Sequence, residues 1–358
     1  MPRTNKIADD VHKTLKKPIQ PKKKHNGVLI PTGSSLLNLA CSDDINGGFM
    51  VGRMVNIIGD SDAGKSFLAF TVFAEAAKRK DLKDYRFIYD DAENASSFDV
   101  EYLFGQDVVD RVESPGPDGK CSETIEEFDC FLDDVFKEGR PAIYILDSFD
   151  AISTEQDQDK MDEFREAKRK GKEVSGTYGM AKPKKASAMF ANVCAKLRKH
   201  NVLLIIISQT RDNISPMSFS PKTRSGGKAL KFYSTHEMWL ACAKTHEKKE
   251  IPVGADVVVK VSKNKLTGKK RKVKFSLFYD YGVDDIASMV DYLIAFGEWT
   301  KNGTNIVCKG LGDFTGNRAK IIRHIENEGL EDELKAIVSQ TWERNEEVLK
   351  LNRKRKYT

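Results

Sequence analysis

The sequence predicts an α/β protein built on a mainly parallel β-sheet. Apolar runs of strand length alternate with segments of helical spacing, the runs are apolar throughout, and a glycine-rich turn joins the first of them to a helix. Strands buried on both faces lose the alternation of inward and outward side chains, and alternating strands and helices are typical of parallel sheets covered by helices. The 358 residues, 40% of them apolar, suffice for one large domain with additions.

The predicted parallel strands are four short apolar runs, at 54–58, 86–90, 142–147 and 202–208. Segments with helical spacing, the second of them with a Ser cap and Glu at the third helical position, are expected at 65–80, 122–138 and 184–200. Segment 154–185 is highly charged with scattered glycines, so we expect a loop or a weakly ordered excursion there.

After residue 230 the pattern changes to more alternating strands. Antiparallel strands that extend the sheet are expected at 237–243, 255–264 and 270–279, with a turn at 266–269 between the last two. A smaller α+β module with helices near 317–328 and 330–351 begins at about residue 287. The predicted division is an N-terminal arm, a core and a C-terminal domain, at 1–30, 31–286 and 287–358.

The net charge of +6 is concentrated in the N-terminal arm. Residues 1–26 carry eight Lys or Arg and two Asp, so the remaining chain is neutral. A basic arm on a neutral body favours a polyanionic partner, with a simple solvated leader as the open alternative. No apolar run reaches the roughly 18 residues of a membrane helix, and the six dispersed cysteines indicate reduced thiols inside a cell.

The stretch VNIIGDSDAGKSFL, residues 55–68, has the spacing of a phosphate-binding loop between a strand and a helix. In such loops, backbone N–H groups at the glycine-rich turn and helix N-terminus point at phosphate oxygens. Lys65 is expected to offset the β/γ-phosphate charge, and Ser66 to give Mg²⁺ a hydroxyl ligand. The predicted nucleotide-binding residues are Gly59, Asp60, Ser61, Asp62, Ala63, Gly64, Lys65, Ser66 and Phe67.

Acidic residues come after two of the predicted strands. Asp147 ends the strand at 142–147, where a second contact to Mg²⁺ is expected, although a role as N-cap of the next segment is an alternative. Glu93 comes after the strand at 86–90 and is a candidate general base for the attacking water. On spacing alone, Asp90 and Asp91 compete with it.

A long polar segment, residues 210–227, comes after the fourth strand and Gln209. It lacks periodicity, and such loops are uncommon unless functional. Cations track a phosphate backbone and apolar side chains wedge between bases, which favours nucleic-acid binding over the alternative of a solvated surface loop. The residues concerned are Arg211, Ile214, Met217, Lys222 and Arg224, before the closing Gly226 and Gly227.

Several segments resemble the RecA/RadA recombinase family, most closely its bacterial and phage-encoded branches. They are TGSSLLNLA, DAEN, YILDS, LLIIISQT, GGKALKFY and KVSKNKLTG, which occur in the family's order between about residues 30 and 330. The resemblance implies a RecA-like P-loop ATPase core with a mainly parallel sheet, an antiparallel extension and a small α+β C-terminal domain. It implies a cytoplasmic, DNA-dependent ATPase that uses ATP and Mg²⁺, forms helical filaments on single-stranded DNA, and exchanges strands with homologous duplex DNA.

The resemblance also implies roles for individual residues. Together with Lys65, Glu93 would act in catalysis by activating water, and Gln209 would sense the γ-phosphate and order the second DNA-binding loop at 210–227. A first DNA-binding loop would lie at about 168–184, with Gly179, Met180 and Lys184.

Three further residues would connect copies of the chain. Lys263 and Lys265 would reach a neighbour's ATP, and Phe232 would relay between the second loop and that interface. From the residues alone, the alternative is that the two lysines face solvent and that Phe232 is an ordinary core residue.

The chain departs from the family at its end, LNRKRKYT, which is basic where bacterial members usually have an acidic tail that restrains DNA binding. This points away from tail autoinhibition and toward duplex contact by the last module. A ring helicase with the same core, and a non-exchanging regulatory paralogue, are the alternative functions; the intact set of Lys65, Ser66, Glu93 and Asp147 argues against the paralogue. Single-strand-binding and mediator proteins are further partners of such recombinases.

Overall fold

The computed structural model describes residues 25–94, 98–171, 181–212, 222–224, 227–312 and 314–354. These residues form two compact units. The larger, the core unit, comprises residues 27–283, and the smaller contains the described chain from residue 284 onward together with residues 25 and 26. Within the described ranges, no helix is both long and apolar enough to cross a membrane.

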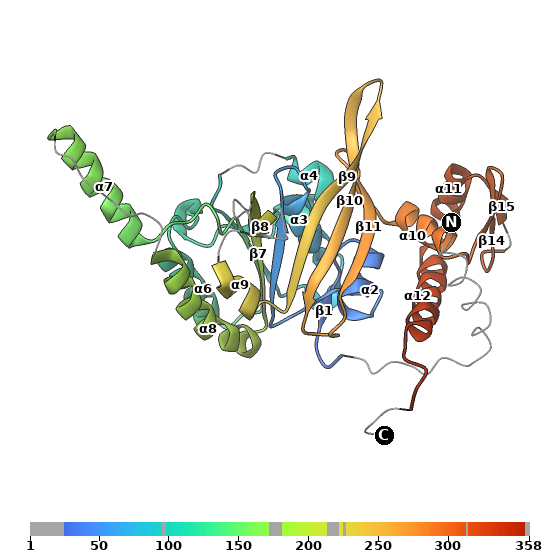
Figure 1. Cartoon of the computed structure of the whole chain (residues 1–358), viewed down its shortest axis with the longest axis horizontal. Coiled ribbons are helices and arrows are strands. Elements are labelled where there is room, and N and C mark those ends of the chain that lie inside the picture. Colours follow the sequence, from blue (N-terminus) through green and yellow to red (C-terminus); the bar gives the residue numbers. More distant parts are fainter. Residues whose placement is uncertain are drawn as a thin grey trace. The chain divides into compact units, whose positions relative to one another are not determined.

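The core unit is organised around a ten-stranded sheet with the order β12-β11-β10-β9-β3-β7-β6-β4-β5, and β8 pairs with the end of β7 (Figure 1). Its strands are β3 (Met54–Gly59), β4 (Arg86–Asp91), β5 (Val112–Glu113), β6 (Ala142–Asp147), β7 (Val202–Asp212), β8 (Lys222–Arg224), β9 (His236–Lys248), β10 (Ile251–Asn264), β11 (Arg271–Phe278) and β12 (Gly282–Asp284). The ladders that join β5, β4, β6, β7, β3 and β9, in that order, are parallel. The ladders that join β9, β10 and β11 are antiparallel. The predicted parallel sheet with an antiparallel extension is therefore confirmed.

A separate two-stranded sheet joins β1 (Leu29–Ile30) and β2 (Phe49–Met50). The helices of the core unit are α2 (Ser35–Ser42), α3 (Lys65–Ala77), α4 (Val100–Phe104), α5 (Gln106–Val109), α6 (Ile125–Glu138), α7 (Glu155–Arg169), α8 (Ala181–His200) and α9 (Gly227–Tyr233). Three of them, α3, α6 and α8, correspond to the predicted helices, and the short helices α2, α4, α5 and α9 were not predicted.

The predicted Ser cap of α6 is wrong. Thr124 is the N-cap, and its Oγ1 accepts a hydrogen bond from the backbone N–H of Glu127 at 3.1 Å. The Glu127 carboxylate reaches back to the N–H of Glu123, so the capping box exists two residues later than expected. Ser122 instead binds the buried carboxylate of Asp90, a long-range partner that the local pattern does not reveal.

The prediction of a loop or a weakly ordered excursion at 154–185 is wrong for residues 155–169, which form α7, and for residues 181–185, which belong to α8. Thr154 caps α7 by accepting from the N–H of Asp157 at 3.1 Å. Acidic residues in its first turn and basic residues in its last turn complement the helix dipole. None of its residues is buried, so no apolar stripe indicated a helix, and α7 extends away from the sheet (Figure 1).

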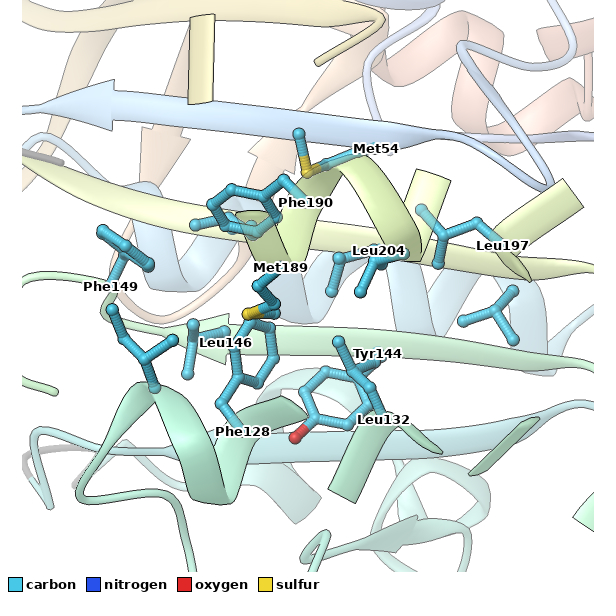
Figure 2. Close-up of a cluster of buried hydrophobic side chains, with 14 of the residues drawn as sticks. Met54, Phe128, Leu132, Tyr144, Leu146, Phe149, Met189, Phe190, Leu197 and Leu204 are labelled. Atoms are coloured by element: carbon cyan, nitrogen blue, oxygen red, sulfur yellow. The ribbon is translucent and has the colours of Figure 1, made fainter. Parts of the chain in front are cut away.

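A cluster of buried apolar side chains fixes the strands that carry the candidate site. Figure 2 shows side chains from α6 and α8 packed against those of β6 and β7. Fully burying one such side chain stabilises the fold by about 1.5–3 kcal/mol. The labelled members are Met54, Phe128, Leu132, Tyr144, Leu146, Phe149, Met189, Phe190, Leu197 and Leu204.

The smaller unit contains three helices and a three-stranded antiparallel sheet, as predicted for an α+β module. The elements are α10 (Asp285–Ala295), β13 (Thr300–Asn302), β14 (Asn305–Cys308), β15 (Phe314–Gly316), α11 (Arg318–Glu328) and α12 (Glu331–Val348). Trp299, Ile325 and Leu334 are among its buried residues.

Candidate nucleotide and DNA site

The predicted phosphate-binding loop lies between the end of β3 at Gly59 and the start of α3 at Lys65. Gly64 has φ 79°, a left-handed conformation that favours glycine. A Cβ atom on Gly59 would lie 2.9 Å from the carbonyl oxygen of Leu240, so the turn needs the bare backbone there. Residues 60–62 are exposed, which leaves the loop open toward solvent.

The Lys65 ammonium lies over this loop and donates to the carbonyl oxygen of Asp60 at 2.7 Å. Burial lowers the pKa of Lys65. Four carboxylates oppose that shift, those of Asp147, Glu93, Asp60 and Asp150. These four carboxylates therefore place negative charge around the Lys65 ammonium.

Asp147 is the last residue of β6, and 5% of its surface is exposed. It accepts hydrogen bonds from the Tyr89 hydroxyl at 3.0 Å and from the Ser66 hydroxyl. Burial raises the pKa of Asp147, and these two hydrogen bonds oppose the shift. The alternative role of Asp147 as a helix N-cap is wrong, because α7 is capped by Thr154.

Glu93 is brought to the same edge of the sheet as Asp147. Its N–H donates to the Asp147 carbonyl at 3.1 Å, and its Oε1 accepts from the Ser148 hydroxyl and, at 2.8 Å, from Gln209 Nε2. Glu93 itself is exposed. The segments that come after β4 and β6 and the C-terminal part of β7 thus meet at one carboxylate that solvent can reach.

Asp90, which competed with Glu93 on spacing, has a structural role. It is fully buried and accepts from the N–H and hydroxyl of Ser122 at 2.7 and 2.6 Å and from the Tyr144 hydroxyl at 2.7 Å. Burial raises its pKa, against these hydrogen bonds. Asp91 lies opposite Asp147 in the ladder between β4 and β6.

Gln209 pairs with Gly59 in the ladder between β7 and β3. Its backbone N–H donates to Asp150 Oδ2 at 2.7 Å, and the hydroxyl of the next residue, Thr210, donates to the Asp60 carboxylate. Ser148 and Asp150 were not predicted as site residues, and Thr210 was included only as the first residue of the predicted loop at 210–227. The available signal was the position of Ser148 and Asp150 just beyond the end of β6, and of Thr210 next to Gln209 in β7.

The ends of the predicted second DNA-binding loop form strands rather than loop. Thr210–Asp212 of β7 pairs antiparallel with Lys222–Arg224 of β8, so Arg211 lies opposite Thr223. Gly227 begins α9. Ile214, Met217 and Gly226 lie outside the described residues.

The predicted first DNA-binding loop, at about 168–184, overlaps the ends of two helices. Arg169 is the last residue of α7 and Ala181 the first of α8, so Lys184 is an exposed helical residue. Gly179 and Met180 lie outside the described residues, as do the basic arm up to residue 24 and the tail from residue 355.

Lys263 and Lys265 lie beside the C-terminus of α9. Lys263 Nζ donates to the carbonyl oxygens of Lys231 and Phe232, the latter at 2.9 Å, and Lys265 Nζ donates to that of Phe232 at 2.9 Å. Cations are favourable at the negative end of a helix dipole. The Phe232 side chain is 68% exposed, so the alternative that it is an ordinary core residue is wrong.

Aromatic side chains pack against Phe67, a feature not predicted from the sequence. Phe67 packs against Phe104 of α4 with ring centroids 5.0 Å apart, and a Cβ on Gly282 would lie 3.7 Å from the Phe67 ring. Tyr102 on α4, and Tyr279 and Tyr281 before Gly282, are exposed.

The fold and this edge of the sheet define a phosphate-loop nucleotide-binding protein of the α/β class. The family model for the RecA N-terminal domain matches residues 16–284. Protein RecA of Aquifex aeolicus is 29% identical over 293 residues, 80% of this chain and 76% of the relative. Protein RecA of Thermus thermophilus is 29% identical over 283 residues, 77% and 74% of the two chains. Protein RecA of Caulobacter vibrioides is 26% identical over 310 residues, 83% and 79%. The chain belongs to the RecA family of recombinases.

Proposed function

We propose that this chain is an ATP-dependent DNA recombinase that forms helical filaments on single-stranded DNA and exchanges strands with a homologous duplex. The observation that carries the proposal is the position of Gln209. Its side chain binds the candidate catalytic carboxylate of Glu93, and its strand continues into the candidate DNA loop. Gln209 therefore contacts the candidate base and also lies on the strand that leads to the candidate DNA loop.

Nucleotide binding is proposed to use the phosphate-binding loop and the strand end at Asp147. Phosphate oxygens would bind the N–H groups of residues 60–64 and the Lys65 ammonium. Within the described ranges, no group of three His, Cys, Asp or Glu side chains suits a metal ion. Mg²⁺ in nucleotide sites uses one or two protein ligands and completes its shell with phosphate and water, which suits the hard oxygens of Ser66 and Asp147. The bound ion would supply charge neutralisation at the phosphates.

Glu93 is proposed as the base that accepts a proton from the attacking water. Its exposed carboxylate can reach a water molecule, while Ser148 and Gln209 hold its Oε1 in place. General bases must lie within hydrogen-bonding reach of the proton that they abstract. Asp90 is unsuited to this role because its oxygens are buried and occupied.

Binding of DNA is proposed to depend on the γ-phosphate through Gln209. Contact of its side chain with the phosphate would fix β7, the strand that leads into the candidate DNA loop, in a nucleotide-dependent switch. Hydrolysis would remove the contact and permit release. ATP binding would therefore drive assembly, and ATP hydrolysis would drive turnover.

Filament formation is proposed to use the surface around Lys263, Lys265 and Phe232. Two cations beside an exposed aromatic ring are suited to meet the phosphates of a nucleotide held by the next copy. A head-to-tail contact of this kind generates an open helical assembly when its rotation does not close.

The direct test compares ATP hydrolysis with and without single-stranded DNA for the wild type and Gln209→Ala. We expect the wild type to be stimulated by DNA, and the variant to bind ATP yet lose the stimulation and strand exchange. Electron micrographs with DNA and a slowly hydrolysed ATP analogue should show filaments. Rings would support a helicase instead, and hydrolysis that ignores DNA would contradict the proposal.

A further inference from the structure

Asp150 occupies the place where β6 stops and β7 continues. The last β6–β7 pair is Leu146 with Ile206, after which the N–H of Phe149 donates to the Ile207 carbonyl at 2.9 Å. Groups on one edge of a strand recur every second residue. The next β7 donor on that edge is therefore Gln209, and the Asp150 carboxylate accepts its hydrogen bond at 2.7 Å in place of a strand carbonyl.

Lys182 holds the turn that carries Asp150. Its Nζ donates to the carbonyl oxygens of Phe149 at 2.6 Å and of Ile152, and lies 3.4 Å from that of Asp150. The ammonium also lies 4.7 Å from the centre of the Phe149 ring. Lys182 is the second residue of α8, the helix that comes after the candidate first DNA loop.

We propose that Asp150 is a positioning residue that holds Gln209 against Glu93, and that Lys182 makes this position dependent on the start of α8. The inference rests on the proposed function and deepens it, because it supplies a route from the first DNA loop to the carboxylate that activates water. The motif residues themselves give no reason to single out either side chain.

The direction of the Gln209 side chain depends on the orientation of its backbone. A hydrogen bond from a backbone N–H to a carboxylate is charge-assisted and short, so it fixes the peptide plane of Gln209. The side chain leaving that Cα then reaches Glu93 Oε1 at 2.8 Å. Lys182 is a second anchor of the same turn, because its three carbonyl contacts link the turn to α8. Displacement of α8 would therefore move the acceptor of the Gln209 N–H.

The first experiment compares Asp150→Ala with Asp150→Asn. The asparagine keeps an oxygen that can accept from the Gln209 N–H, whereas the alanine does not. We expect Asp150→Ala to lower the DNA-stimulated turnover of ATP about tenfold, with KM for ATP and the affinity for a fluorescent ATP analogue changed less than about twofold. Asp150→Asn should retain at least half of the wild-type turnover. Asp134→Ala, on the exposed face of α6, is the matched control.

The second experiment tests whether Asp150 acts through Gln209. In the Gln209→Ala background, Asp150→Ala should cause no further loss of DNA-stimulated turnover, because the side chain that it positions is already absent. Lys182→Met should reproduce the selective loss by releasing the turn from α8, with Lys196→Met on the same helix as its control. This second site keeps the inference testable if Asp150→Ala does not fold.

Three results would overturn the inference. They are wild-type stimulation in folded Asp150→Ala and Lys182→Met, equal defects in Asp150→Asn and Asp150→Ala, and additive losses in the double variant. The proposed function fails separately, by a wild-type chain whose ATP hydrolysis does not respond to single-stranded DNA. A wild-type response with unaffected variants leaves the recombinase proposal standing and removes only the role of Asp150.

Discussion

Gln209 donates its side-chain amide to Glu93 Oε1 at 2.8 Å, although the two residues are 116 positions apart in the chain. The contact joins the end of β7, which leads toward DNA, to the segment after β4, which carries the candidate base. Parallel strands of one sheet present their carboxyl ends at the same edge, which is why such distant residues meet there. The contact places the Gln209 side chain, through which nucleotide and DNA are proposed to be coupled, beside the candidate base.

Replacing Glu93 by Gln should separate ATP binding from hydrolysis. A positioned general base contributes about 10²–10⁴-fold to rate, so we expect phosphate release to fall by about a hundredfold or more. Affinity for an ATP analogue should change little, because the loop and Lys65 remain intact. Glu138→Gln, at the exposed end of α6, is the control. Hydrolysis at the wild-type rate would show that Glu93 is not the base.

Asp147 should make the Mg²⁺ requirement depend on pH. Because burial raises its pKa, the carboxyl takes up a proton at a higher pH than an ordinary aspartic acid as the solution is acidified. We expect the Mg²⁺ concentration for half-maximal hydrolysis to rise on acidification in the wild type. Asp147→Asn should need more Mg²⁺ at every pH and lose most of this dependence. An unchanged Mg²⁺ requirement in the variant would exclude Asp147 as a metal ligand.

The lysine pair should act between copies of the chain. We expect Lys263→Ala combined with Lys265→Ala to abolish long filaments and DNA-stimulated hydrolysis. Binding of ATP by single copies of the chain should persist, because each copy carries its own phosphate-binding loop. Electron micrographs and an ATP-analogue titration would measure the two effects. Lys260→Ala, an exposed residue of β10, is the control. Normal filaments from the double variant would contradict the proposed interface.

The ionised Asp256 carboxylate should stabilise the β9–β10–β11 region at neutral pH. Burial opposes ionisation, but hydrogen bonds from Ser276, His246 and Lys274 outweigh it and lower the pKa of Asp256 to about 2. A depressed pKa contributes stability above the unfolded-state value, and that contribution is lost as pH falls from about 4 toward 2.

The matching variant is Asp256→Asn. We expect it to lower the free energy of unfolding by about 2 kcal/mol at neutral pH, with the difference disappearing near pH 2. Urea denaturation at several pH values measures this, and Asp280→Asn is the exposed control. A pH-independent difference between wild type and Asp256→Asn would refute the assignment.

Much of the fold was predictable because it is encoded locally. The apolar runs at 142–147 and 202–208 and the glycine spacing at 59–66 carry signals that need no tertiary context, and the structure places all of them as expected. The helix α7 was not predictable in the same way, since its stability comes from capping and charge order rather than from a buried face. The cap of α6 was misplaced because Ser122 has a distant partner in Asp90.

The candidate site likewise contains residues that local patterns predict and contacts that depend on tertiary structure. Lys65, Ser66 and Asp147 were predictable because each belongs to a short motif or to the end of a strand. The hydrogen bonds of Asp150 to Gln209 and of Thr210 to Asp60 depend on the order of strands in the sheet, which places β7 between β3 and β6. Composition and spacing do not specify that order.

The most direct measurement of the central claim is the affinity for single-stranded DNA in two nucleotide states. Fluorescence anisotropy of a labelled oligonucleotide should show tight, cooperative binding with a slowly hydrolysed ATP analogue and much weaker binding with ADP. For Gln209→Ala, the two nucleotides should give nearly equal, weak affinities. Equal affinity of the wild type in both states, or an undiminished difference in the variant, would contradict the coupling of the γ-phosphate to DNA through Gln209.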